Sequence, residues 1–254
     1  MAFVLRVSQE AEVGAAVTIH TIWLRRIHKW VGLTIGLQVL LWAVSGAMMA
    51  MLDMGEVAGG ETRNPPSFTE RAAARDGWEN VGRQLGATPI TGARLNRLLG
   101  RQVYHLTTAD GVRVFDAETG RSVSIDAALA GKVARTVHPD NAIVRKVAAL
   151  ERLTFAVRNH ELPVWRVDFE DPQNSSYYVS GTTGDLLERR NDSWRLWDFF
   201  WMLHTMDYAK RTNFNHPLIV LFAVATVWLT GTGFWLLCRT GWRSDFKTLK
   251  RRAL

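Results

Sequence analysis

Two long segments without a charged side chain constrain this chain more than any other feature. The first covers residues 30–52 and the second covers residues 217–238. A helix needs about 20 apolar residues to cross the hydrocarbon core of a bilayer, and both segments are longer than that. A buried helix of a large soluble core is the alternative, but such helices rarely run so far without a charge. The sequence therefore predicts two transmembrane helices.

The charges of the two tails predict how these helices are oriented. Residues 1–29 contain four basic and two acidic side chains, and residues 239–254 contain six basic and one acidic. Their surplus of positive charge accounts for the whole net charge of +7. Basic flanks remain on the cytoplasmic side of a membrane. We therefore expect a bacterial inner-membrane protein with two cytoplasmic tails and a periplasmic domain, and no nucleic-acid partner.

The residues between the spans, 53–195, are predicted to form this periplasmic α+β domain. Its first part, 53–66, is rich in glycine, proline and polar residues and is expected to be a linker. Helices are expected over 68–85 and 141–155, because apolar residues recur there at helical spacing. Short strands are expected after each helix, with a hairpin turn at Asp110-Gly111. The fold class is thus membrane α-helical plus α+β.

Two parts of the domain resemble each other. Residues 103–106 (Val-Tyr-His-Leu) align with 164–167 (Val-Trp-Arg-Val), and both 114–120 and 178–184 end in Thr-Gly. The match predicts two copies of a helix-plus-hairpin unit, at about 67–126 and 139–190. A chance likeness between two ordinary hairpins is the alternative.

These residues also resemble a known family. Leu-Pro-Val-Trp-Arg-Val at 162–167, with 177–179 and 183–185, resembles the PepSY repeat. Residues 26–33 and 202–207 resemble the segments that flank this repeat in PepSY-associated transmembrane proteins. The resemblance covers about residues 20 to 240.

The resemblance implies an activity and a cofactor. Better understood members are similar to inner-membrane haem b proteins that reduce ferric siderophores in the periplasm, whereas other members have no assigned activity. It therefore implies a haem b electron-transfer protein. Those members often have four transmembrane helices, whereas two are predicted here.

Three of the seven histidines flank membrane-depth structure and are the candidate axial ligands of haem iron: His28, His204 and His216. Neutral imidazole is the usual donor to such an iron. His204 lies in an aromatic segment, 196–212, predicted to be amphipathic and to lie at the outer interface. An interfacial histidine without a metal is the alternative for each. The histidines of the domain, His138 and His160 among them, are expected at solvated positions.

Small residues in the spans permit two interpretations. They would let a flat macrocycle approach the helices, or they would let the helices pack closely against each other. They are Gly32, Gly36, Ser45 and Gly46 in the first span and Thr230, Gly231, Thr232 and Gly233 in the second.

The predicted positions of the histidines indicate an assembly. His28 and His216 are expected a membrane thickness apart, roughly 30 Å, so they cannot bind one haem. A homodimer would form a four-helix bundle in which facing histidines pair. Another membrane subunit is the alternative partner.

Recognisable catalytic motifs are missing from the sequence. It contains no hydrolase signature, no phosphate loop and no nicotinamide or flavin fingerprint. Electrons would then come from a quinol or a redox partner. Two functions remain open: a haem b protein that reduces a periplasmic acceptor, and a membrane-anchored module that binds a peptide or protein.

Overall fold

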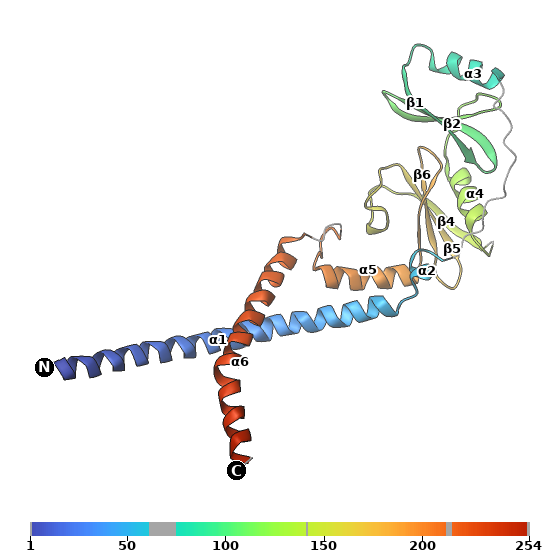
Figure 1. Cartoon of the computed structure of the whole chain (residues 1–254). Coiled ribbons are helices and arrows are strands. Elements are labelled where there is room, and N and C mark those ends of the chain that lie inside the picture. The colour runs from blue at the N-terminus through green and yellow to red at the C-terminus, as the bar shows by residue number, and fades with distance from the viewer. Residues whose placement is uncertain (1, 61–74, 141, 212–214, 253–254) are drawn as a thin grey trace. The chain divides into compact units, whose positions relative to one another are not determined.

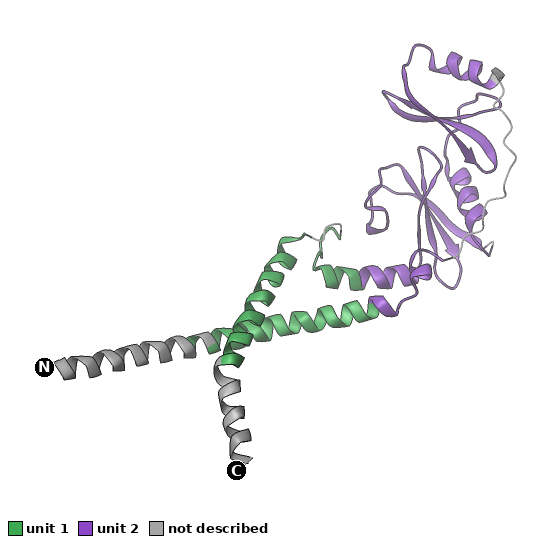
Figure 2. Ribbon diagram, in the orientation of Figure 1, with its two compact units in different colours: residues 1–48, 200–254 green, residues 49–199 purple. Residues whose placement is uncertain are grey.

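The computed structural model describes residues 2–60, 75–140, 142–211 and 215–252. The chain divides into two compact units (Figure 2). One unit contains Met1–Met48 and Phe200–Leu254, and the other contains Met49–Phe199.

The first unit is built on two long helices, α1 (Ala2–Met51) and α6 (Pro217–Arg252) (Figure 1). Their stretches Arg25–Met51 and Pro217–Cys238 are long and apolar enough to cross a membrane. These stretches match the two predicted spans. Many large apolar side chains on both helices are exposed, as lipid contact requires: Leu33, Leu37, Leu40, Leu221, Val224 and Val227.

The second unit begins with a short helix, α2 (Met54–Val57), capped by the Asp53 side chain. The next described element is α3 (Arg75–Leu85), which confirms the second part of the helix expected over 68–85. The earlier part of that helix, and the end of the predicted linker, lie outside the described residues.

A three-stranded antiparallel sheet follows, in the order β1-β2-β3. Its strands are β1 (Ile90–Leu98), β2 (Arg101–Thr108) and β3 (Gly111–Asp116). The hairpin at Asp110-Gly111 is confirmed, because Thr108 pairs with Gly111 across it. Strand β1 was not predicted. The strand expected over 122–125 is reduced to one bridge between Ser122 and Phe115.

The structure corrects the prediction for the next segment. The helix lies at α4 (Ala127–Val137), where the Asp126 side chain accepts the Leu129 N–H as an N-cap. Residues expected to be helical over 141–155 instead form β4 (Ile143–Ala149) and the 3-10 turn Phe155–Val157. The apolar spacing fitted a helix, but β4 pairs with β5 along almost its whole length. Cross-strand pairing and β-branched side chains therefore outweighed the helical periodicity.

The second sheet is antiparallel in the order β4-β5-β6-β7. Its remaining strands are β5 (Val164–Glu170), β6 (Ser176–Ser180) and β7 (Leu186–Arg190). Both halves of this unit thus run helix and then antiparallel strands, three in the first half and four in the second. The aligned sequences fall on equivalent strands, β2 with β5 and β3 with β6. The second half starts at Asp126, earlier than the predicted boundary at 139.

Both Thr-Gly turns of the alignment adopt the same backbone. Gly120 has φ 67° and Gly184 has φ 75°, a left-handed conformation that glycine adopts without strain. The main core of this unit combines residues from both halves: Leu98, Val103, Val114, Ile125, Ala130, Val133, Ala134, Val167, Phe169, Tyr177 and Val179.

His138 is a correction to the sequence analysis, because its side chain is buried instead of solvated. The residue is 2% exposed and stacks on Tyr177. Its Nε2 lies 3.0 Å from Oδ2 of Asp171, and its Nδ1 accepts the N–H of Asp140. Burial opposes ionisation of Asp171, but hydrogen bonds from Ser175 and His138 outweigh it and hold the pKa of that carboxyl below its ordinary value.

Candidate functional site

His28 on α1 is held by the facing helix α6. Its Nδ1 lies 2.9 Å from the hydroxyl of Thr232. That hydroxyl donates its single proton to a carbonyl of its own helix, Trp228 at 2.9 Å or Leu229 at 3.0 Å. With its proton on that carbonyl, the hydroxyl accepts from the ring, and in this tautomer Nδ1 carries the proton. The lone pair of the neutral imidazole is therefore on Nε2.

His204, in the last turn of α5 (Asp192–Thr205), repeats this arrangement on α1. Its Nδ1 lies 3.1 Å from the hydroxyl of Ser45. The Ser45 hydroxyl donates to the carbonyl of Leu41 at 2.7 Å, or to that of Trp42 at 3.2 Å. In the tautomer that matches this donation, the Ser45 oxygen accepts from Nδ1–H and the lone pair is on Nε2.

A glycine follows the hydroxyl residue at both places. A Cβ atom on Gly233 would lie 3.3 Å from Cε1 of His28, and one on Gly46 would lie 3.4 Å from Cε1 of His204. Such contacts are tighter than ordinary van der Waals packing. The pairs Thr232-Gly233 and Ser45-Gly46 thus combine a ring acceptor with room for the ring.

His216 has a different role in the structure. Its Nδ1 accepts the backbone N–H of Leu218 at 3.3 Å, so the lone pair of this nitrogen is already engaged. Because α6 begins at the next residue, Pro217, this contact caps the helix. The structure therefore separates His216 from the other two candidates.

The two hydroxyl-bound histidines form separate sites. On α1, the stretch from His28 to Ser45, the residue that holds His204, is about 25 Å long at about 1.5 Å per residue. Two axial ligands must reach one iron atom from its opposite faces, which this separation prevents. These two rings therefore cannot bind the same iron atom.

Two buried donors lie on the same side of α1 as Ser45. Among the residues that the structure describes, neither Nε2 of Gln38 nor Nε1 of Trp42 has a hydrogen-bond partner. The three residues recur at spacings of four and three, which places them on one helix face. An unpaired buried donor costs about 1–3 kcal/mol. Both donors are therefore available to an acceptor from outside the described residues.

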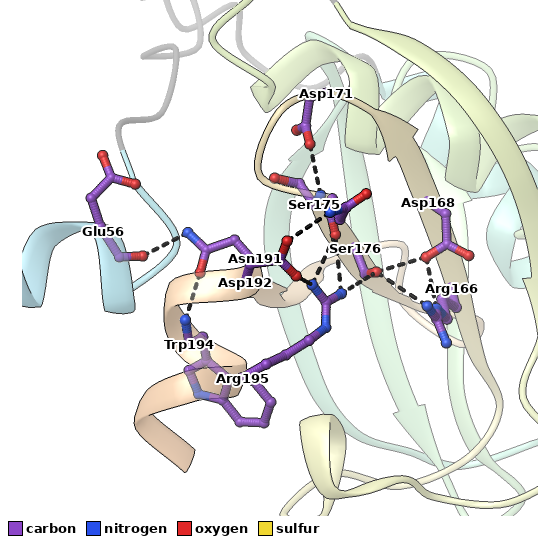
Figure 3. Close-up of polar contacts among 11 residues, drawn as sticks. Glu56, Arg166, Asp168, Asp171, Ser175, Ser176, Asn191, Asp192, Trp194 and Arg195 are labelled. Atoms are coloured by element: carbon purple, nitrogen blue, oxygen red, sulfur yellow. Dashed lines mark hydrogen bonds and ion pairs between the residues drawn. The ribbon is translucent and has the colours of Figure 1, made fainter. Parts of the chain in front are cut away.

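The start of α5 is fixed by polar contacts of the second unit (Figure 3). The Asn191 side chain accepts the N–H of Trp194 as an N-cap and donates to the carbonyl of Glu56. Arg195 donates to Asp192 and to the hydroxyl of Ser176. These contacts set where the helix that carries His204 begins. The amphipathic segment predicted at 196–212 corresponds to the later part of this helix and the residues after it.

Sequence reasoning missed the roles of several of these residues. It treated Ser45 and Thr232 only as small residues that permit haem approach or helix packing, because nothing in the sequence says which histidine a hydroxyl faces. Gln38 was identifiable from the sequence as an unusual residue, because it is an amide inside an otherwise apolar span. Within the described part of the chain, no three His, Cys, Asp or Glu side chains gather to hold a bare metal ion.

Comparison with known proteins decides the family. The model of the PepSY-associated TM region matches residues 25–253, nearly the whole chain. The chain belongs to this family. The matched region of this PepSY-associated membrane protein includes both histidine sites and the two sheets between them. No curated protein and no solved structure matches the chain.

Proposed function

We propose that this PepSY-associated membrane protein is a haem b electron-transfer protein whose axial ligands are His28 and His204. The observation that carries the proposal is the shared state of these two rings. Each ring is held through Nδ1–H by a hydroxyl of a facing helix and keeps its Nε2 lone pair unshared among the described residues. Ligating histidines are oriented in this way, with the other ring nitrogen hydrogen-bonded.

The residues around these rings fit haem in two further respects. Gly46 and Gly233 let the rings lie close to the facing helices, where a Cβ atom would crowd them. The unpaired donors of Gln38 and Trp42 leave hydrogen-bonding capacity on this helix face for a bound group. Bound haem supplies a one-electron iron couple. The protein itself orients the imidazoles through Ser45 and Thr232 and surrounds them with apolar helices.

The proposed substrate class rests on two points. The sequence shows no nicotinamide or flavin fingerprint, and the proposed orientation sets which side of the membrane each histidine faces. With basic tails in the cytoplasm, His28 lies toward the cytoplasm and His204 toward the periplasm. A membrane quinol is the proposed reductant, and a ferric complex such as a ferric siderophore is the proposed acceptor. His216 serves as a helix cap in this proposal.

An optical spectrum of the purified protein tests the proposal. Protein expressed with added haem and purified in mild detergent is expected to show a Soret band, with sharp α and β bands after reduction. Such bands are typical of low-spin haem with two nitrogen ligands. A colourless protein that is folded and membrane-inserted would contradict the redox function.

The orientation is tested separately. An alkaline-phosphatase reporter inserted after Gly111, in an exposed turn, is expected to be active because that enzyme matures only in the periplasm. The same reporter fused after Leu254 is expected to be silent, because the basic tail remains inside. The matched control is a fluorescent protein that matures only in the cytoplasm, fused at the same two positions. The reverse pattern would overturn the orientation.

A second candidate function is a membrane-anchored module that binds an extended protein segment. The observation that favours it is strand β1, which is the edge strand of its sheet. This function does not exclude the first, because β1 and the two histidines belong to different units of the chain.

A further inference from the structure

Strand β1 has an open outer edge. Among the described residues, no strand pairs with β1 except β2. The opposite edge of the sheet is partly covered, because β3 forms a bridge to Ser122 and the N–H of Val123 donates to Val114. An open strand edge offers backbone donors and acceptors to an added strand.

The register of β1 identifies the groups that face outward. Leu98 pairs with Arg101 across the two-residue turn Leu99-Gly100, so that pair exchanges hydrogen bonds. Along an antiparallel ladder, hydrogen-bonded pairs alternate with non-hydrogen-bonded pairs. Ala93 and Leu95 belong to non-hydrogen-bonded pairs, so their N–H and C=O groups point away from β2. The bulge of β1 lies at its start, between Ile90 and Gly92, so the pairing from Gly92 onward is regular.

One face beside this edge is apolar and exposed. Helix α3 packs Val81 and Leu85 against Leu106 and Phe115, on β2 and β3. It leaves Leu95 on β1 53% exposed. Trp78 of α3 is 45% exposed and packs edge-on against Tyr104, the cross-strand partner of Leu95. An apolar strip thus runs along β1 on the α3 side.

The other face beside the edge is basic. Arg94 and Arg101 lie there, since they pair with His105 and Leu98 on the face away from α3. Both are exposed, and no ion pair involves them among the described residues. Asp185 is the acid nearest this face, and its carboxylate already accepts from Asn96. Residues 90–101 contain no acidic residue, and their third arginine, Arg97, lies on the α3 face at the end of the apolar strip.

We propose that the outer edge of β1 binds an extended protein segment in which apolar and acidic side chains alternate. Backbone groups of the segment pair with Ala93 and Leu95, as in β-strand addition. Its apolar side chains lie on Leu95 and Trp78, and its acidic side chains lie beside Arg94 and Arg101. Alternation is required because successive side chains of a strand point to opposite faces.

A second copy of β1 is a poorer occupant of this edge. Two antiparallel β1 strands would bring arginine next to arginine, and neither strand has an acid to compensate. The equivalent first strand of the other sheet, β4, is a poorer edge as well. Its bulge lies within the strand, between Val144 and Lys146, and interrupts a regular ladder.

The proposal is tested with full-length protein in detergent and a fluorescein-labelled peptide of five Val-Glu repeats. Saturable binding by anisotropy is expected, with none for the matching Val-Lys peptide. Hydrogen exchange of the Ala93 and Leu95 amides is expected to slow by about tenfold or more on binding, because the added strand accepts from them. The amides of β4 serve as the internal control.

Two variants place the peptide. Ala93→Pro removes an outward N–H without removing a β1–β2 bond, so binding is expected to be lost. Arg94→Glu is expected to weaken binding of the Val-Glu peptide by about tenfold and to create binding of the Val-Lys peptide. Arg121→Glu, an exposed change outside β1, is the matched control and is expected to have no effect. If Ala93→Pro unfolds the protein, the test rests on two other results. These are the peptide preference of Arg94→Glu and the hydrogen exchange of the wild-type Ala93 and Leu95 amides.

Three results would overturn the proposal: no saturable binding, binding that survives Arg94→Glu unchanged, or protection confined to other strands. Protection of Ala93 and Leu95 that rises with protein concentration in the absence of peptide would instead assign the edge to a second copy. None of these results depends on haem, so the proposal stands or fails apart from the redox function.

Discussion

Replacing either His28 or His204 with alanine is expected to remove about half of the bound haem, and replacing both is expected to remove nearly all of it. The two histidines belong to separate sites, His28 facing Thr232 of α6 and His204 of α5 facing Ser45 of α1, so each change empties one site and leaves the other. An alanine side chain cannot replace a metal–imidazole bond. Membrane insertion is expected to persist, because neither change shortens an apolar span.

Haem content per chain, from the pyridine haemochrome spectrum, measures this effect. His160→Ala is the matched control, since the His160 ring lies 2.9 Å from Glu188 in the second unit, and full haem content is expected. His138→Ala is unsuitable because that ring is buried in the core. His216→Ala is expected to keep its haem and to lose only a helix cap. Equal haem in the His28, His204 and His160 variants would refute the assignment.

Haem-loaded protein is expected to be a dimer, or to be bound to another membrane subunit. One chain presents one histidine at each site, whereas a six-coordinate iron of this type needs two axial ligands. A two-fold axis parallel to α1 would pair His28 with its copy and His204 with its copy, in a four-helix bundle. Native mass spectrometry in mild detergent measures the mass of the haem-containing species.

The double variant provides the control for this experiment. If haem bridges the two chains, the protein that lacks both His28 and His204 is expected to dissociate at a lower detergent-to-protein ratio and at a lower dilution factor than the wild type. A strictly monomeric species that carries haem with two nitrogen ligands would contradict the paired-histidine arrangement.

The sequence by itself determined the features that depend on length, charge and local turn chemistry. An uncharged run such as 217–238 has one stable solution in lipid, a helix that satisfies its own backbone, and the structure ends the apolar stretch at the same residues. Asp110-Gly111 fixed a hairpin because few residue pairs fit so tight a turn. The repeated Thr-Gly turns at Gly120 and Gly184 marked equivalent strands for the same reason.

Contacts between distant segments decided the rest. The apolar spacing of 141–155 suits a helix, and only pairing with β5 made Ile143–Ala149 a strand. His138 resembles a solvated turn residue in the sequence, but Phe169 and Tyr177 bury it. The proton positions on His28 and His204 depend on Thr232 and Ser45, which lie far from them along the chain. A local pattern cannot encode which hydroxyl a ring will meet, because that partner exists only after the helices pack.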